Sequence, residues 1–288
     1  MNCNLCKRNC NVDRTKLTGF CHANDKIKIA KYMLYHYEEP PISGATGSGA
    51  IFFSNCNLRC VYCQNYEISL EEYGKEITIE EFADICIKLQ SLGALNINLI
   101  TPGHYAYQIK EGLMLAKEKG LQIPVVYNTN SYENAETIKM LDGLIDIYLP
   151  DFKYYDNDLA IKYSSAPFYV ETAKKAINEM YKQVGKPVFE KGIMKKGMIV
   201  RHLMLPTLNK NTKDIIKYLY ETYKNNIYIS IMNQYTPMKY FDDEILNKTV
   251  TKKEYENIID YAYDLGIRNC FVQEDETKSK SFIPTFKE

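Results

Sequence analysis

Cys56, Cys60 and Cys63 are the residues whose type and spacing point most directly to chemistry. They lie within the segment NCNLRCVYCQN, separated by three and then by two residues. Thiolate is the ligand that selects zinc or iron-sulfur clusters, and a four-iron cluster has four irons to hold. Three cysteines leave one of these irons without a protein ligand, and an open position on a metal is where a substrate or cofactor binds.

Two simpler interpretations compete with an open cluster. A zinc ion could take a histidine as its fourth ligand, but no histidine lies nearby at a usual ligand spacing. The three thiols could also simply be buried, as free cysteines often are. Because the segment around them is mostly polar, the sequence favours the cluster.

A second group of four cysteines lies at the N-terminus with the spacing C-x2-C-x3-C-x10-C: Cys3, Cys6, Cys10 and Cys21. Four thiolates can close a metal site completely, which indicates a structural zinc ion or an electron-relay cluster. His22, directly after Cys21, is an alternative ligand. The sequence thus predicts a second metal site and leaves its metal open.

The composition is that of an ordinary globular protein. Of 288 residues 45% are hydrophobic, and 36 basic residues balance 36 acidic ones, so nothing favours nucleic acid or an anionic membrane as partner. The chain has no signal-like start and no apolar run of the roughly 18 residues of a membrane span, so we expect a cytoplasmic protein. In that reducing compartment nine cysteines indicate metal ligation rather than disulfides. The two isolated ones, Cys86 and Cys270, are expected in the core.

From residue 50 onward, apolar runs rich in β-forming residues alternate with amphipathic helical patterns. Strands are expected at 50–54, 96–100, 124–129, 145–151, 198–205, 227–235 and, as a seventh, 269–273. Helices are expected between them at 78–93, 107–120, 134–144, 171–185, 212–225 and 253–266. In the first of these, Thr78 and Glu81 are placed for a capping box. Upstream, we expect a short helix at 28–41 and a flexible loop at 43–49.

Near-continuous apolar strands that alternate with helices predict a parallel sheet covered by helices. Polar residues follow several of the strands: Asn128, Thr129, Asn130, Asp151, Lys153, Arg201, His202, Asn233 and Gln234. Polar side chains that converge from many strand ends are typical of a barrel rather than an open sheet. We therefore predict an α/β fold with a partial (β/α)6 TIM barrel at 46–275, a cysteine-rich metal-binding extension at 1–45 and a tail at 276–288.

These residues also carry a family resemblance. CNLRCVYC is a CxxxCxxC loop with an aromatic residue, Tyr62, before its third cysteine, and it resembles the signature of radical S-adenosylmethionine (SAM) enzymes. EEPPISGATGSGAIFFSN precedes the loop, and PDFKY, VRHLMLP, MNQYTP and FIPTF follow it in this order. Together they are similar to the branch of the pyruvate formate-lyase activating enzyme over nearly the whole chain.

The resemblance implies a [4Fe-4S] cluster on Cys56, Cys60 and Cys63, with SAM chelating the fourth iron through its amino and carboxylate groups. An electron donor such as flavodoxin or ferredoxin would reduce the cluster. Cleavage of the S–C5′ bond would then give methionine and a 5′-deoxyadenosyl radical that removes a hydrogen atom from a substrate. The cofactor carries this chemistry, and the protein positions it and excludes water.

The strand-end residues are of the types that SAM needs as contacts. Arg201 is expected to pair with the SAM carboxylate through a charge-assisted contact. Asp151 and Lys153 match a DxK motif that lies near SAM in the related activases. We expect the remaining cofactor contacts at Tyr62 and Gln234 against adenine, at His202 on ribose or methionine, and at Asn128.

One segment departs from the activase pattern. The activases present a GGE-like sequence after the second strand, which binds the SAM amino group, whereas this chain has LITPGHY at 99–105. Thr101 and the backbone of Pro102 and Gly103 are the substitutes we expect, although no carboxylate is present there.

The motifs do not identify a substrate, so the target is either a protein glycine, as in the activases, or another molecule. The competing hypothesis is a non-catalytic electron-transfer or metal-binding protein with two cysteine sites. An electron carrier has no use for an open iron or for a set of SAM contacts at the strand ends, so the sequence favours the enzyme.

Overall fold

The computed structural model describes residues 3–273 and 284–286. Most of the tail predicted at 276–288, and the first two residues of the FIPTF motif, therefore lie outside the described residues. Within the described residues no helix is long and apolar enough to cross a membrane.

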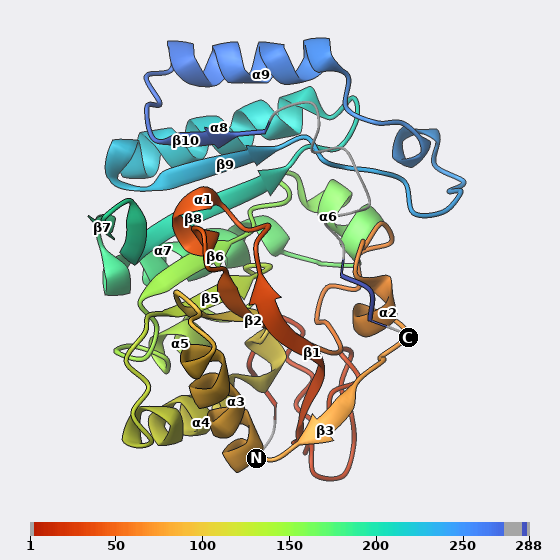
Figure 1. Cartoon of the computed structure of the whole chain (residues 1–288). Coiled ribbons are helices and arrows are strands. Elements are labelled where there is room, and N and C mark those ends of the chain that lie inside the picture. Colours follow the sequence, from red (N-terminus) through yellow and green to blue (C-terminus); the bar gives the residue numbers. More distant parts are fainter. Residues whose placement is uncertain (1–2, 274–283, 287–288) are drawn as a thin grey trace.

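The strands join into one ten-stranded sheet with the order β10-β9-β8-β6-β5-β4-β2-β1-β3, and β7 pairs with β8 at its side. Their bounds are β1 (Ile27–Tyr35), β2 (Ser48–Phe53), β3 (Lys75–Ile77), β4 (Ile97–Ile100), β5 (Val125–Thr129), β6 (Ile147–Pro150), β7 (Val188–Glu190), β8 (Ile193–Leu203), β9 (Tyr228–Met232) and β10 (Cys270–Val272). The run from β2 through β10 in this order is parallel throughout. The ends of the sheet are not paired with each other, so the barrel stays open (Figure 1).

Helices follow the parallel strands and lie along the outside of the curved sheet (Figure 1). The α-helices are α1 (Pro40–Ser43), α2 (Tyr66–Ser69), α3 (Ile79–Ser91), α4 (Ala106–Glu118), α5 (Ala135–Lys139), α6 (Asn157–Ser164), α7 (Tyr169–Val184), α8 (Asn209–Tyr223) and α9 (Lys252–Asp264), and short 3-10 turns lie at η1 (Gly103–Tyr105), η2 (Lys224–Asn226) and η3 (Glu244–Asn247). Six strand-helix units followed by β10 confirm the predicted partial (β/α)6 barrel.

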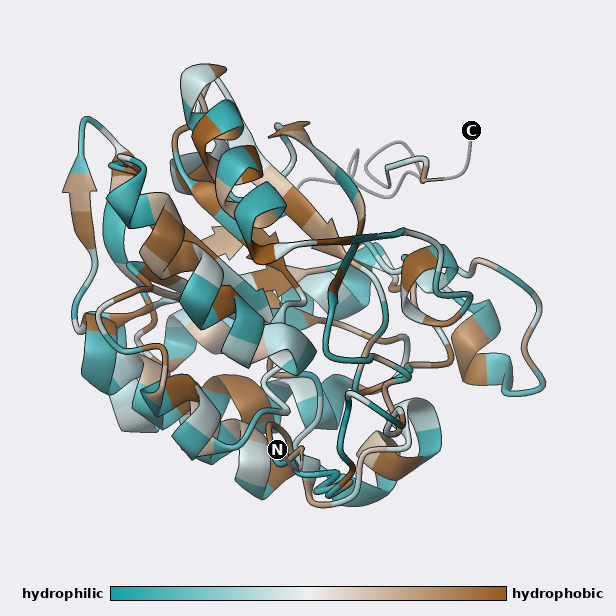
Figure 2. Ribbon diagram, turned by 90° about the horizontal axis from the view of Figure 1, so that it is seen from below, coloured by the Kyte–Doolittle hydropathy of each residue, from teal (hydrophilic) through white to brown (hydrophobic). Residues whose placement is uncertain are grey.

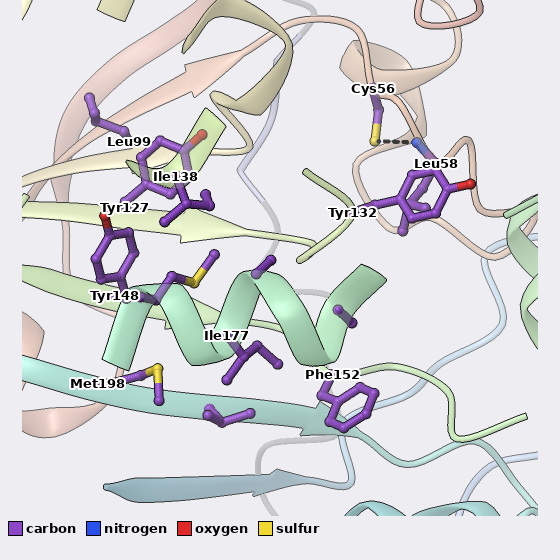
Figure 3. Close-up of a cluster of buried hydrophobic side chains, with 14 of the residues drawn as sticks. Cys56, Leu58, Leu99, Tyr127, Tyr132, Ile138, Tyr148, Phe152, Ile177 and Met198 are labelled. Carbon is purple, nitrogen blue, oxygen red and sulfur yellow. Dashed lines mark hydrogen bonds between the residues drawn. The ribbon is translucent and has the colours of Figure 1, made fainter. Parts of the chain in front are cut away.

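The helices are amphipathic, with apolar residues toward the sheet and polar residues outward (Figure 2). In α3 the predicted capping box is present, because Thr78 accepts from the backbone of Glu81 and the Glu81 side chain accepts from that of Thr78. Figure 3 shows Tyr127 of β5 and Tyr148 of β6 near α7, which carries Ile177. These side chains belong to the large core between strands and helices.

Alternate residues of each strand face the barrel interior instead of the helices, as the period of two in a strand requires. Val126, Ile147 and Ile199 form a separate small core with Ile42 of α1. Asn128 and Arg201 follow Val126 and Ile199 at a spacing of two and so share their interior face. This alternation decides which strand-end residues can reach the site.

The predicted helix at 28–41 is wrong, because residues Ile27–Tyr35 form β1, antiparallel to β2. Ile27 and Ile29 are buried at a spacing of two, which is the strand period. Pro40 begins α1 instead of ending a helix, as proline is favoured in the first helical turn. The predicted loop at 43–49 is also shorter than expected, since β2 begins at Ser48. The sheet thus starts inside the segment expected as an extension.

Candidate active site

A cavity of about 610 Å³ lies at the C-terminal ends of the parallel strands and extends into the barrel interior. The sequence motifs predicted which residues meet there, although they lie far apart in the chain. Its lining includes the three loop cysteines and all but one of the expected cofactor contacts: Cys56, Cys60, Cys63, Tyr62, Thr101, Asn128, Asp151, Lys153, Arg201 and Gln234. The missing residue is His202.

The CxxxCxxC loop leaves the end of β2 and turns sharply. Asn55 and Arg59 adopt positive φ angles of 73° and 61°, which reverse the chain on both sides of Cys56. The Cys56 and Cys60 residues are 9% and 8% exposed. The loop therefore holds its thiols at the cavity wall, largely shielded from solvent.

Hydrogen bonds are aimed at each of the three sulfurs. The backbone N–H of Leu58 donates to Cys56 Sγ at 3.4 Å (Figure 3), and the hydroxyl of Ser69 donates to Cys63 Sγ at 3.2 Å. Asn130 Nδ2 donates to Cys56 Sγ at 3.5 Å. Donors to sulfur stabilise thiolate ligands and tune the potential of a cluster, so the loop fits an iron-sulfur cluster.

Cys60 lies at the end of a chain of hydroxyl groups. Ser164 donates to Cys60 Sγ at 2.9 Å, the hydroxyls of Tyr154 and Ser164 are 2.7 Å apart, and those of Tyr62 and Tyr154 are also 2.7 Å apart. Burial raises the pKa of the Cys60 thiol to about 12, so the thiol keeps its proton until a metal binds. Metal binding then releases this proton. Ser164 lies on α6, a helix that the sequence analysis missed, and local sequence does not reveal its partner.

Lys153 and Asp151, the DxK residues, form a partly buried ion pair at 2.8 Å. Burial by itself would raise the pKa of Asp151, but the charges of Lys153 and Arg201 outweigh it and hold this pKa below its usual range. Burial raises the pKa of Cys60 and of Cys63, and the positive charge of Lys153 lowers both pKa values in part. Lys153 therefore places a positive charge beside the cysteine loop.

Arg201 is held on three sides by the protein itself. It contacts Asp151 at 3.1 Å and Glu38 at 2.9 Å, and it donates to Asn128 Oδ1 at 2.6 Å. Glu38 Oε1 also accepts from Asn98 at 3.0 Å and from Asn128 at 3.2 Å. Local sequence does not mark Glu38, which precedes α1 and reaches the site only because that segment folds into the barrel interior.

His202 is buried and does not line the cavity, which corrects its expected place among the cofactor contacts. Its ring lies 2.8 Å from the carbonyl oxygen of Phe152 and 3.0 Å from the hydroxyl of Thr212 on α8. Burial lowers its pKa to about 4. Because Arg201 faces the interior, its neighbour His202 must face the helices.

Two expected adenine contacts, Tyr62 and Gln234, line the cavity but already have partners in the protein. Tyr62 is 6% exposed and shares its hydroxyl with Tyr154. Gln234 Oε1 accepts from Gln273 Nε2 at 2.9 Å. Their contact with adenine stays a prediction.

The segment in place of the GGE-like sequence has an unusual backbone. Thr101 has a φ of 59°, which is rare for a β-branched residue, and it lines the cavity. Gly103 lies against the buried carboxyl of Glu133, where an added Cβ would collide with Oε1. Burial raises the pKa of Glu133 to about 7. A buried acid thus lies behind this turn, and the cavity lining does not include it.

The N-terminal group lines a second, much smaller cavity with His104: Cys3, Cys6, Cys10 and Cys21. The alternative ligand His22 is not among its lining residues. His22 lies on the surface with its side chain 50% exposed and its Nδ1 2.6 Å from Glu72. The structure therefore brings the four predicted cysteines together and leaves His22 outside.

A family model described as the radical SAM superfamily matches residues 50–219, more than half of the chain. The chain belongs to the radical SAM superfamily. The match begins in β2 and includes the CxxxCxxC loop, the DxK residues and Arg201. Most of the residues that line the large cavity therefore lie within the matched segment.

Among curated proteins, the chain is similar to uncharacterized protein MJ0674 of Methanocaldococcus jannaschii, with 28% identity over 92% of this chain and 76% of that one. Uncharacterized protein MJ0808 of the same organism is 25% identical over 74% of this chain and 63% of its own length. Streptococcus suis SuiB bound to S-adenosylmethionine aligns with a TM-score of 0.53 and 13% identity, over 77% of this chain and 49% of that one. The chain spans less than two thirds of MJ0808 and about half of SuiB. The likeness to SuiB shows a shared fold alone.

Proposed function

We propose that this member of the radical SAM superfamily is an enzyme that cleaves SAM at a [4Fe-4S] cluster bound by Cys56, Cys60 and Cys63. When bound, the cluster and SAM supply reductive cleavage of SAM and removal of a hydrogen atom from a substrate. The observation that carries the proposal is the shared cavity, which joins three hydrogen-bonded thiols to charged groups from the strand ends. A cavity of this size and lining is typical of a cofactor site.

Within this site we assign the SAM carboxylate to Lys153 instead of Arg201. Among the described residues Lys153 donates only to Asp151, so two of its three N–H groups stay available. Arg201 is already held by Glu38, Asp151 and Asn128. Arg201 therefore orients Asp151 and Asn128, and Lys153 provides the cation that faces the cofactor.

We expect Lys153→Met to weaken SAM binding by about 10- to 100-fold, since a hydrogen bond to a charged group is worth about 1.5–3 kcal/mol. Asp151 keeps its contact with Arg201, so the fold should persist. Isothermal titration of the reconstituted protein with SAM measures the change, and Lys162→Met, at an exposed position with its own ion pair, is the matched control. Equal SAM affinity in the two variants contradicts the assignment.

The function itself is tested by anaerobic reconstitution with iron and sulfide, followed by dithionite and SAM. Formation of 5′-deoxyadenosine and methionine is the expected result. If the cluster is present by its iron, sulfide and absorption spectrum but no 5′-deoxyadenosine forms, the enzyme proposal fails and a non-catalytic iron-sulfur protein is left.

We place the enzyme with the relatives of the pyruvate formate-lyase activating enzyme, on the DxK residues and the order of the later motifs. Its substrate is then a protein glycine in a glycyl radical enzyme or another molecule that enters the same cavity. A flavodoxin or ferredoxin is the expected electron donor and the cytoplasm the expected compartment. Deuterium transfer from a labelled candidate substrate into 5′-deoxyadenosine identifies the target.

We also propose that the N-terminal cysteine group binds a second metal, either a zinc ion or an iron-sulfur cluster. The support is that Cys3, Cys6, Cys10 and Cys21 line one small cavity. Four thiolates are enough to close such a site without a vacancy.

A further inference from the structure

We propose that His104 supplies a ligand from the barrel to the N-terminal metal site. The inference rests on the second metal site of the proposed function and adds a residue that its cysteine pattern does not contain. His104 lies in η1, after β4, and lines the same small cavity as the four cysteines. It is more than 80 residues away from them in the sequence.

The N-terminal thiols are prepared as ligands in the same way as those of the catalytic loop. In the catalytic loop, the backbone N–H two residues onward points at the sulfurs of Cys56 and Cys63. Burial raises the pKa of the Cys6 and Cys21 thiols, and hydrogen bonding to the backbone of Arg8 and of Ala23 acts against this rise. Phe20 N–H donates to Cys10 Sγ at 3.4 Å. N–H donors of this kind stabilise a thiolate, the form that binds metal.

The tautomer of His104 leaves a lone pair free for a metal. Its Nε2 lies 2.7 Å from the carbonyl oxygen of Ser54, which can only accept, so Nε2 carries the proton. Nδ1 then has the lone pair and, among the described residues, has no hydrogen-bond partner although His104 is only 3% exposed. A buried unpaired nitrogen is costly, and a metal ion or cluster would satisfy it. The bond to Ser54 is the outer contact that metal-binding histidines usually make.

The site therefore offers five donors, of which a zinc ion takes four and an iron-sulfur cluster takes one for each iron. Among the described residues no three histidine, cysteine or acidic side chains surround a point closely enough for a single ion. A zinc ion would thus draw the donors together, whereas a cluster needs wider spacing because each ligand binds a different iron. The experiment below therefore examines both zinc and an iron-sulfur cluster.

Metal binding there would also support the catalytic loop. Arg8, which lines the small cavity, donates from Nε to the carbonyl oxygen of Asn57 at 3.0 Å, directly after Cys56. The Asn57 side chain accepts from Asn130 at 2.7 Å. His104 would close this connection from the other side, since Ser54 is two residues before Cys56.

The test uses the full chain with Cys56, Cys60 and Cys63 replaced by Ala, so that bound metal reports on the N-terminal group. X-ray absorption at the zinc or iron edge of this protein should show a nitrogen ligand beside sulfur. A shell of sulfur alone overturns the proposal, as does the absence of metal. This readout is independent of SAM cleavage, which is measured in the unmodified chain, so the two proposals fail separately.

His104→Gln is the decisive variant, because its amide can still donate to Ser54 while the lone pair of Nδ1 is lost. Loss of an outer partner alone costs about 10- to 100-fold in metal affinity, so we expect at least a 10-fold loss in zinc-chelator competition and a sulfur-only shell. His22→Ala is the matched control and should bind as before. Equal affinities and spectra in the two variants overturn the proposal.

Discussion

Cys60→Ala is expected to abolish 5′-deoxyadenosine formation completely. Cys60 is the central cysteine of the loop, and its sulfur accepts from Ser164 at 2.9 Å inside the cavity. Without it a second iron loses its protein ligand, and the cluster can no longer present a single open position. The measurement is chromatography of 5′-deoxyadenosine after reconstitution and dithionite reduction, together with iron and sulfide content.

Cys86→Ala is the control for the loss of a cysteine. Cys86 is fully buried on α3 and lines neither cavity. It should lose some stability, because a buried side chain is shortened, but keep its product yield per cluster. Product formation by Cys60→Ala at the rate of this control would sink the ligand assignment.

Arg201→Met is expected to lower the free energy of unfolding by about 3–5 kcal/mol, the usual effect of removing one partner from a buried ion pair. Glu38 has a side chain only 7% exposed and would keep only the amides of Asn98 and Asn128. Asp151 would keep Lys153. Urea denaturation of the metal-free protein measures the loss without interference from the cofactor.

Two further variants separate this network from a general effect of losing arginine. Arg268→Met removes a guanidinium that donates to the exposed or part-buried backbone carbonyls of Tyr263 and Ile267, and it should cost about 1 kcal/mol or less. Glu38→Gln added to Arg201→Met should recover part of the loss, since the buried negative charge is then gone. If Arg201→Met is no more destabilising than Arg268→Met, the network does not hold the barrel interior together.

The strands and helices of the barrel could be predicted because each carries its own period. Val125–Thr129 and residues 198–203 of β8 are apolar enough to be recognised as buried strands, and Thr78 with Glu81 marks the start of α3. One exception, Ile27–Tyr35, has mostly residues of intermediate exposure and precedes two prolines. Its strand conformation depends on pairing with β2, a contact between segments that local sequence does not encode.

The candidate site also has residues that local sequence predicts and residues that it does not. The three cysteines of the loop and the DxK residues were predictable because their spacing is local and chemically restrictive. The alternation of β8 would also have excluded His202, since Arg201 and its neighbour cannot face the same side of a strand. That rule was available in the sequence and needed only to be applied.

The sequence by itself determined the number and spacing of the cysteines that predict the metal chemistry, because these are properties of short segments. Only the tertiary structure decided which groups meet those ligands. Glu38 reaches Arg201 across 163 residues, Ser164 reaches Cys60 across 104, and His104 joins the N-terminal cysteines around one cavity. Such contacts arise where the barrel brings strand ends and loops to one face, and no period or spacing along the chain records them.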